Sequence, residues 1–86
     1  MDLSLEKFMQ MISDHLGIDE SEITPETSFL DDLGIDSLSL INFIIKLERK
    51  FGIKINLDSI WTLKNIREAY QVFVDKINKK KEQVQV

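Results

Sequence analysis

The chain has 86 residues, of which 43% are hydrophobic, so it can build one small core but not a deep catalytic cleft as well. It contains no cysteine, which excludes a disulfide framework, a thiolate nucleophile and the usual cysteine-based metal sites. No stretch approaches the roughly 20 apolar residues of a membrane-spanning helix, and the first residues lack the apolar run of a signal peptide. We therefore expect a monomeric, cytoplasmic protein without membrane insertion, with one domain over residues 1–78 and a basic, frayed tail over residues 79–86.

The net charge of −4 conceals a division of the chain into an acidic and a basic part. Residues 1–36 hold ten acidic side chains and one basic one, a net −9, whereas residues 37–86 hold five acidic and ten basic ones, a net +5. The two parts should therefore present different surfaces to partners. The basic side chains are spread over two predicted helices and the tail, without the interleaved aromatic residues that stack on bases, so we expect no nucleic-acid partner.

The first helical pattern covers residues 4–16, with Ser4 suited to the N-cap and Gly17 to the position just past the end. Apolar residues recur in this segment at helical spacing: Leu5, Phe8, Met9, Ile12 and Leu16. His15, the single histidine, is expected to be a surface residue near the C-terminus of this helix.

The connection over residues 18–36 is long for a compact domain, so we expect buried side chains to anchor it. The candidates are its apolar residues: Ile18, Ile23, Phe29, Leu30 and Leu33. Seven acids lie in the same segment, but they do not follow the calcium-binding loop of an EF-hand. If Gly34 were the glycine of that loop, Phe29 would occupy its first position and Leu40 its last, and neither side chain binds calcium. We expect no metal site.

The second helical pattern, over residues 37–51, has an apolar surface wider than that of an ordinary amphipathic helix. One arc is assigned to the core: Leu40, Phe43, Ile44, Leu47 and Phe51. Outside this arc, Leu38, Ile41 and Ile45 are either covered by another part of the chain or form an exposed docking strip. Before the helix, Gly34 permits a left-handed turn, and Asp36 and Ser37 are both residue types that cap helix N-termini.

The rest of the chain predicts two further helices, one short and one long. Residues 53–57 alternate like a strand, but a lone strand has nothing to pair with, so we interpret them as an extended connection. A single helical turn follows, presenting Ile60 and Trp61. Thr62 is the expected cap of the last helix, whose apolar stripe is Leu63, Ile66, Tyr70, Phe73 and Ile77. The prediction is an all-α fold, an antiparallel four-helix bundle of three long helices and one short, with a long loop between the first two.

Ser37 is the candidate functional residue, because a serine at a helix N-terminus lies where free backbone N–H groups and the helix dipole favour a phosphate. The segment Gly34-Ile35-Asp36-Ser37-Leu38, followed by Leu47-Glu48 and Phe51-Gly52-Ile53, resembles the acyl carrier proteins over about residues 5–77. In that family the serine of an Asp-Ser-Leu motif carries 4′-phosphopantetheine, whose thiol holds an acyl group as a thioester. The resemblance implies a non-catalytic carrier with Ser37 as its attachment site and Asp36 and Leu38 beside it.

The resemblance also implies partners and further site residues. A phosphopantetheinyl transferase would load the prosthetic group from coenzyme A, and enzymes of the ketosynthase, ketoreductase, dehydratase and acyltransferase types would process the cargo in fatty acid or polyketide biosynthesis. The residues expected to dock these partners are Ile41, Ile45, Lys46, Glu48 and Arg49. The acyl chain would enter between the second and third helices, at Phe29, Leu47, Ile55, Ile60 and Leu63.

This chain departs from the usual pattern of the family on its second helix. Carriers of housekeeping fatty acid synthesis usually have acids at the positions that Ser39, Asn42 and Arg49 occupy here. Residues 37–51 instead hold three basic side chains against one acid, a net +2. This charge predicts a specialised pathway with its own partner enzymes.

Three alternatives to this interpretation stay open. Ser37 could be the nucleophile of an enzyme, but the chain lacks Gly-x-Ser-x-Gly, and His15 has no assignable orienting acid or oxyanion hole. A helical adaptor without a prosthetic group would use the same apolar surface of the second helix. A peptidyl or aminoacyl carrier is less favoured, since such carriers often have Gly-Gly ahead of the serine, where this chain has Gly34 and Ile35.

Overall fold

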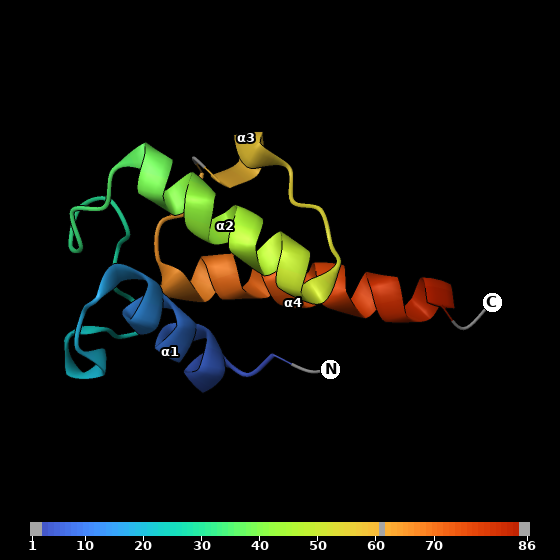
Figure 1. Ribbon diagram of the computed structural model, residues 1–86, viewed down its shortest axis with the longest axis horizontal. Coiled ribbons are helices and arrows are strands. Elements are labelled where there is room, and N and C mark those ends of the chain that lie inside the picture. The colour runs from blue at the N-terminus through green and yellow to red at the C-terminus, as the bar shows by residue number, and fades with distance from the viewer. Residues whose placement is uncertain (1–2, 61, 85–86) are drawn as a thin grey trace.

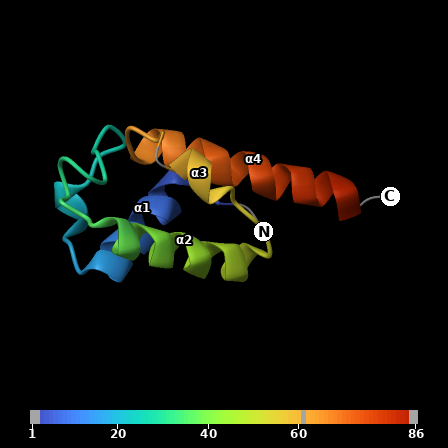
Figure 2. The same ribbon diagram turned by 90° about the horizontal axis from the view of Figure 1, so that it is seen from above.

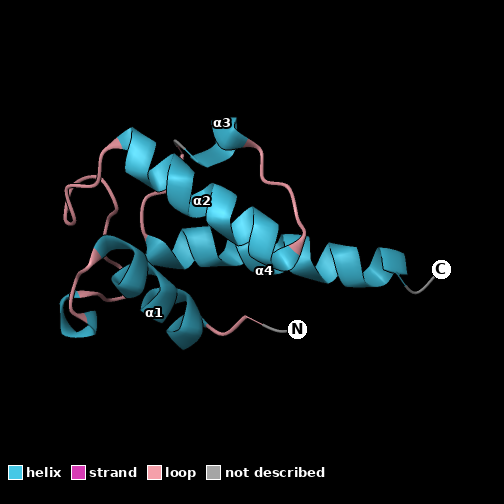
Figure 3. Cartoon of the chain, in the orientation of Figure 1, coloured by secondary structure: helices cyan, strands magenta, loops and turns pink. Residues whose placement is uncertain are grey.

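The computed structural model describes residues 3–60 and 62–84, and for residues 57, 60 and 81–84 it describes the backbone alone. Its elements are α1 (Leu5–Leu16), the 3₁₀ turn η1 (Glu20–Glu22), α2 (Ser37–Phe51), α3 (Leu57–Ile60) and α4 (Ile66–Val84). No strand occurs within these ranges (Figure 3). The predicted all-α class is confirmed, and α3 is a single turn of four residues. Trp61, expected on that turn, lies outside the described residues.

The long helices are not all antiparallel to their neighbours. α2 and α4 run in the same direction, while α1 runs the opposite way (Figures 1 and 2). The connection through α3 passes over both helices and returns the chain to the end at which α2 begins. The predicted antiparallel arrangement is therefore wrong for α2 and α4, because a connection of 14 residues with its own helical turn is long enough to bring the chain back before the next helix starts.

One aromatic ring joins the three long helices. Phe8 of α1 is fully buried, and its ring centroid lies 6.1 Å from that of Phe43 on α2. The same ring lies 5.9 Å from Tyr70 and 5.6 Å from Phe73, both on α4. These separations and the tilted planes, 47° to 54°, are favourable for aromatic pairs. Around this centre the predicted stripes supply most of the core: Ile12, Leu40, Ile44, Leu47, Ile66 and Ile77.

α1 and α2 end in the same way, and in both cases the sequence signal is a glycine. Gly17 and Gly52 have φ of 69° and 65°, in the left-handed region that other residues rarely adopt. The next backbone N–H then turns back to a carbonyl five residues earlier. Ile18 donates to Ser13 and Ile53 to Glu48, both at 3.1 Å. The predicted limits of α1, including the Ser4 cap that accepts from the Lys7 N–H at 3.1 Å, are confirmed.

α4 begins three residues later than predicted. Thr62 does not cap it: its hydroxyl donates to the Ser59 carbonyl at 2.6 Å and so closes the short turn α3. Asn65 takes the capping role, because its side-chain oxygen accepts from the Glu68 N–H at 3.0 Å. Leu63 therefore precedes α4, although it still packs against the core. At the other end α4 continues to Val84, which places helix over most of the segment 79–86; the fraying expected there stays a prediction.

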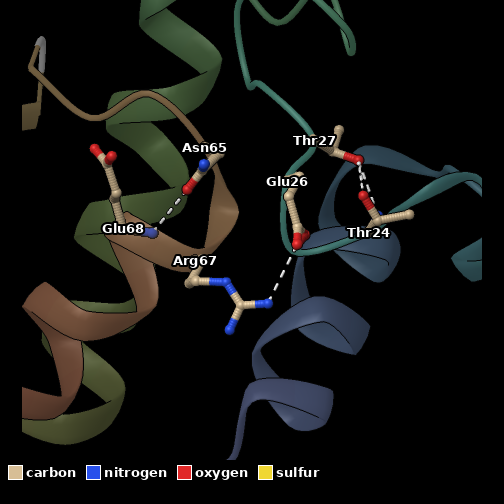
Figure 4. Close-up of polar contacts among 6 residues, drawn as sticks. All are labelled: Thr24, Glu26, Thr27, Asn65, Arg67 and Glu68. Carbon is tan, nitrogen blue, oxygen red and sulfur yellow. Dashed lines mark hydrogen bonds and ion pairs between the residues drawn. The ribbon is translucent and has the colours of Figure 1, made fainter.

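The long first loop is fixed to the N-terminus of α4. The carbonyl of Thr27 accepts from the Ile66 N–H at 3.0 Å, and that of Pro25 accepts from the Arg67 N–H at 2.8 Å. Beside them, the Arg67 guanidinium lies 3.3 Å from the Glu26 carboxylate, as Figure 4 shows. With Asn65, the loop satisfies the first three backbone donors of α4, which have no partner inside the helix.

The apolar anchors of this loop differ in part from those predicted. Ile23 and Phe29 are buried, and Ile18 and Leu33 pack partly against the core. Leu30 is 47% exposed, so its assignment as an anchor is wrong. Ile35, which was not singled out, is buried in its place. A loop has no repeating geometry, so its apolar residues turn inward only where the backbone docks. None of the helices described is long and apolar enough to span a membrane.

Removing the Phe8 ring should strongly destabilise the fold. Phe8→Ala leaves a cavity where α1, α2 and α4 meet, and buried Phe→Ala changes cost about 3–5 kcal/mol. We expect the urea midpoint of unfolding, followed by circular dichroism, to fall sharply. Leu38→Ala is the matched control, because Leu38 is 67% exposed and its truncation should leave the midpoint almost unchanged. Equal losses in both variants would contradict the central role of Phe8.

Candidate functional site

The chain before α2 forms a closed turn held by its own polar groups. The Ser28 carbonyl accepts from the N–H groups of Asp32 at 3.2 Å and Leu33 at 3.1 Å. In return the Asp32 carboxylate accepts from the Ser28 N–H at 2.8 Å, and the Ser28 hydroxyl accepts from the Asp31 N–H at 3.1 Å. One of the loop acids, Asp32, therefore serves the turn through its carboxylate, and the turn gives the chain a fixed approach to α2.

Gly34 and two buried side chains set the direction in which α2 starts. Gly34 has φ of 63°, which confirms the predicted left-handed turn. The next residue, Ile35, is buried, and its N–H donates to the Phe29 carbonyl at 3.1 Å. Phe29 is buried as well, so buried side chains before and after the turn attach it to the core just before the helix. A flexible approach to Ser37 is thereby avoided.

Asp36 is the N-cap of α2, as predicted. Its backbone is extended, and its carboxylate accepts from the Ser39 N–H at 2.8 Å. This hydrogen bond holds the pKa of Asp36 below its ordinary value, since it stabilises the charged carboxylate. The side chain is exposed and stays ionised at neutral pH. It fixes the helix start and leaves the following hydroxyl for other chemistry.

Ser37 is the first residue of α2 and is exposed. Within the described residues its hydroxyl makes no recorded hydrogen bond, because the capping role is taken by Asp36. A free hydroxyl on a rigid helix start, close to the positive end of the helix dipole, fits a residue that carries a phosphodiester. The neighbouring Leu38 is 67% exposed and adds an apolar surface beside the hydroxyl.

The predicted docking residues divide into two groups. Ile41 and Ile45 are half-buried and do not belong to the core cluster, so they contribute apolar surface to the side of α2. Lys46 and Arg49 are exposed. Glu48 differs: it is half-buried, and its carboxylate accepts from the Ile55 N–H at 2.7 Å. Its structural role is to hold the segment after α2 against the helix.

The sequence analysis missed this role of Glu48. The signal that could have revealed it is the Ile55 N–H, which lies in an extended segment that has no strand to pair with. A backbone donor near the core needs a partner, and a carboxylate seven positions earlier, on the last turns of α2, is within reach. The backbone N–H groups at the N-terminus of α4 need acceptors for the same reason, and this need could have indicated that the first loop docks there.

The predicted acyl-pocket residues lie mainly in the core. Phe29, Leu47 and Ile55 are buried, and Leu63, in the segment before α4, is partly buried against the core. The side chain of Ile60 lies outside the described residues. α3, the turn that ends at Ile60, lies above α2 and α4 in Figure 1. The pocket itself stays a prediction.

The structure gives no support to an enzyme with Ser37 as nucleophile. His15 is half-buried, and its ring lies 5.2 Å from that of Phe43, where it extends the aromatic core. Within the described residues no group of three or more histidine, cysteine, aspartate or glutamate side chains could hold a metal ion. The geometry suits attachment of a group at Ser37 rather than catalysis by it.

Comparison with known proteins decides the family. A family model described as "Phosphopantetheine attachment site" matches residues 6–73. The chain is 41% identical over 71 residues to an acyl carrier protein of Rubrobacter xylanophilus, a match that covers 83% of this chain and 88% of that one. It belongs to the acyl carrier protein family. Its fold is similar to the solution structure of the holo acyl carrier protein from Geobacter metallireducens, with a TM-score of 0.76, 31% identity and coverage of 91% of this chain and 90% of that one.

Membership of this family settles the class of function. The protein is a carrier and not an enzyme, and its prosthetic group is phosphopantetheine. Partners of such carriers are in general a phosphopantetheinyl transferase and acyl-processing enzymes. The described residues fit the group chemically: the exposed Ser37 hydroxyl would form the phosphodiester, and the first turn of α2 would face its negative charge.

The Asp36 cap should make the stability of the fold depend on acid pH. Its pKa is lowered in the folded state, so its contribution is fully present above the unfolded-state value, about 4, and is lost as the pH falls through the folded-state pKa. Asp36→Asn, which keeps a capping side chain, should be less stable than wild type at pH 6, and the difference should shrink below pH 4. Urea titrations at both pH values measure this difference. Asp19, whose pKa is lowered by the Ser21 N–H, is present in both proteins and cancels. A difference that does not change with pH would contradict the cap.

Proposed function

We propose that this acyl carrier protein bears 4′-phosphopantetheine on Ser37 and presents acyl thioesters to the enzymes of a specialised fatty acid or polyketide-type pathway. The observation that carries the proposal is the division of work at the start of α2. Asp36 caps the helix, and Ser37, one residue later, is left exposed with an unused hydroxyl. A phosphodiester can therefore be formed there without removing an interaction on which the fold depends.

Loading requires only that a transferase reach this hydroxyl. The Ser37 oxygen would replace the nucleotide part of coenzyme A at phosphorus, so one P–O bond forms as another breaks. The hydroxyl proton would pass to a base of the transferase. The carrier contributes position: the closed turn over residues 28–33 and the buried Ile35 hold the serine at the tip of α2. The apolar Leu38 beside it offers the transferase a first contact.

The attachment site can be tested by intact mass. After incubation with coenzyme A and a phosphopantetheinyl transferase, the wild-type protein should gain the mass of one phosphopantetheine. Ser37→Ala should gain nothing, while its circular dichroism stays helical because Asp36 still caps α2. Ser39→Ala is the control, since Ser39 lies on the same turn and the variant keeps the backbone N–H that donates to the Asp36 cap. Modification of the Ser37→Ala protein would refute the assignment.

The assignment to a specialised pathway rests on the charge of α2. Lys46, Arg49 and Lys50 are exposed, and the single acid of this helix, Glu48, is engaged by the Ile55 N–H. An enzyme that recognises an acidic helix by its own lysines and arginines would meet like charges here, and such contacts are costly. The partner enzymes of this carrier should instead offer acids or neutral polar groups around the Ile41 and Ile45 strip.

Restoring acids on α2 should change the choice of partner. The triple variant Ser39→Asp, Asn42→Glu and Arg49→Glu should raise the acyl-transfer rate of a housekeeping fatty acid synthase enzyme several-fold and lower that of the carrier's own enzyme. The effect should shrink with added salt, because exposed charges more than about 8 Å apart are largely screened from each other at physiological ionic strength. Rates are measured for both carriers with both enzymes at low and high salt. Unchanged rates with the housekeeping enzyme would show that charge does not exclude it.

A further inference from the structure

Charge is separated along the long axis of the molecule. The described fold extends 42 Å by 25 Å by 19 Å. The loop over residues 18–36, with seven acids and no basic residue, lies at the end where α2 starts (Figure 1). The C-terminal parts of α2 and α4 point toward the other end, and they carry most of the lysines. The end opposite Ser37 is therefore basic, and the proposed function accounts for the bases of α2 but not for Lys54 and the lysines of α4.

Two adjoining hollows mark this basic end. The first has a volume of about 390 Å³ and is lined by Gly52, Ile53, Lys54, Lys76, Lys79 and Lys80. The second, of about 380 Å³, is lined by Ile45, Glu48, Arg49, Gly52, Ile53 and Lys54. Three residues, 52–54, belong to both. We call the pair the lysine groove: one part is basic, and the other continues to the apolar side of α2 at Ile45.

Three lysines of the groove lie close together on α4. Lys76, Lys79 and Lys80 lie three and four positions apart on one face of α4, and like charges at this spacing destabilise a helix. Among the side chains that the structure describes, no carboxylate lies within ion-pair distance of them. The Lys80 ammonium has a local function, since it donates to the Phe51 carbonyl at 3.2 Å, at the negative end of the α2 dipole. Lys54, Lys76 and Lys79 are exposed, and no hydrogen bond or ion pair joins their ammonium groups to another side chain that the structure describes.

Gly52 makes room for Lys80 where the two parts of the groove meet. A Cβ at this position would overlap the Lys80 ammonium group, so any other residue would push this lysine away from the end of α2. Residues 52–54 line both hollows, which therefore adjoin each other. An occupant can contact ammonium groups on one side and apolar surface on the other without displacing the chain.

We propose that the lysine groove is a second docking surface, which binds an acidic segment of a partner protein carrying apolar side chains between its carboxylates. Charge complementarity requires an anionic occupant. The hollowed shape favours a protruding chain segment over the flat surface of a bilayer. A simple anion would gain no contact from the apolar part of the groove at Ile45. A peptide segment can place an apolar side chain there beside its carboxylate contacts. The proposal does not depend on Ser37 or on the pathway.

A peptide titration tests the groove directly. The probe is an eight-residue peptide of glutamates with two leucines, and its partner has serine in place of leucine at the same charge. Both are added to ¹⁵N-labelled Ser37→Ala protein, so that the prosthetic group has no influence. The leucine peptide should shift the amide signals of residues 53, 54 and 76–80 and bind about fivefold more tightly than the serine peptide. Equal affinities for the two peptides would show that the groove attracts anions in general, and this would overturn the proposal.

Charge reversal supplies the matched variants. Lys76→Glu with Lys79→Glu should weaken the leucine peptide about tenfold, whereas Lys7→Glu with Lys64→Glu, also at exposed positions, should not. Both double variants change the net charge from −4 to −8, so a general charge effect would be equal in the two. The first should also fold, since Glu at position 76 can pair with Lys80 one turn later. Equal weakening would contradict the proposal.

A vesicle experiment tests the other possible occupant of the groove, a lipid surface. Vesicles of phosphatidylcholine with phosphatidylserine are sedimented with the apo wild-type protein and with the apo forms of both double variants. We expect no co-sedimentation that depends on Lys76 and Lys79. If these lysines hold the protein on vesicles while the leucine peptide leaves the amide signals unchanged, the groove is a lipid-binding surface and the proposal is wrong. Because every arm uses the Ser37→Ala or apo protein, failure here leaves the attachment site unaffected.

Discussion

The rest of the structure depends on how the free backbone N–H groups at the N-terminus of α4 are paired with acceptors. A helix start exposes backbone donors, and leaving such groups unpaired near a core is costly. Here the first loop supplies two of the acceptors, the carbonyls of Thr27 and Pro25, and Asn65 supplies the third. The loop is thereby tied to a helix that follows it by about forty residues. Only the nine residues 28–36 lie between Thr27 and Ser37, and a closed turn and two buried side chains fix their course.

Rigid support and a free reactive group are separated by one residue at the functional end. Asp36 takes the hydrogen bond that the helix start requires, and Ile35 takes the apolar contact with the core. Ser37 has neither duty. A carrier must be modified and then handled by several enzymes in turn, and a hydroxyl that contributes nothing to the fold can be substituted without cost to it. The small core cannot supply a catalytic pocket, but it can hold one helix end in place.

The two ends of α2 have opposite electrostatic character. The N-terminal end, where the dipole is positive, adjoins a loop of acids, and the C-terminal end, where it is negative, receives the Lys80 ammonium from α4. Each end therefore has charges that complement the dipole. The excess lysines around Gly52 and the exposed bases of α2 go beyond that need. Surplus charge of this kind influences the rate and selectivity of association more than the fold, which is why we relate it to partners.

The sequence alone determined the features that depend on a few neighbouring residues. The helical periodicity, the glycines that end α1 and α2, the Asp36 cap and the exposed serine after it are local, because their partners lie within one or two turns. The tertiary structure decided what depends on distant partners. It set the start of α4 at Ile66, the common direction of α2 and α4, the exchange of Leu30 for Ile35 as an anchor and the use of Glu48 to hold Ile55. A backbone donor or an apolar loop residue acquires its partner only when segments far apart in the chain pack together, and no local pattern encodes that choice.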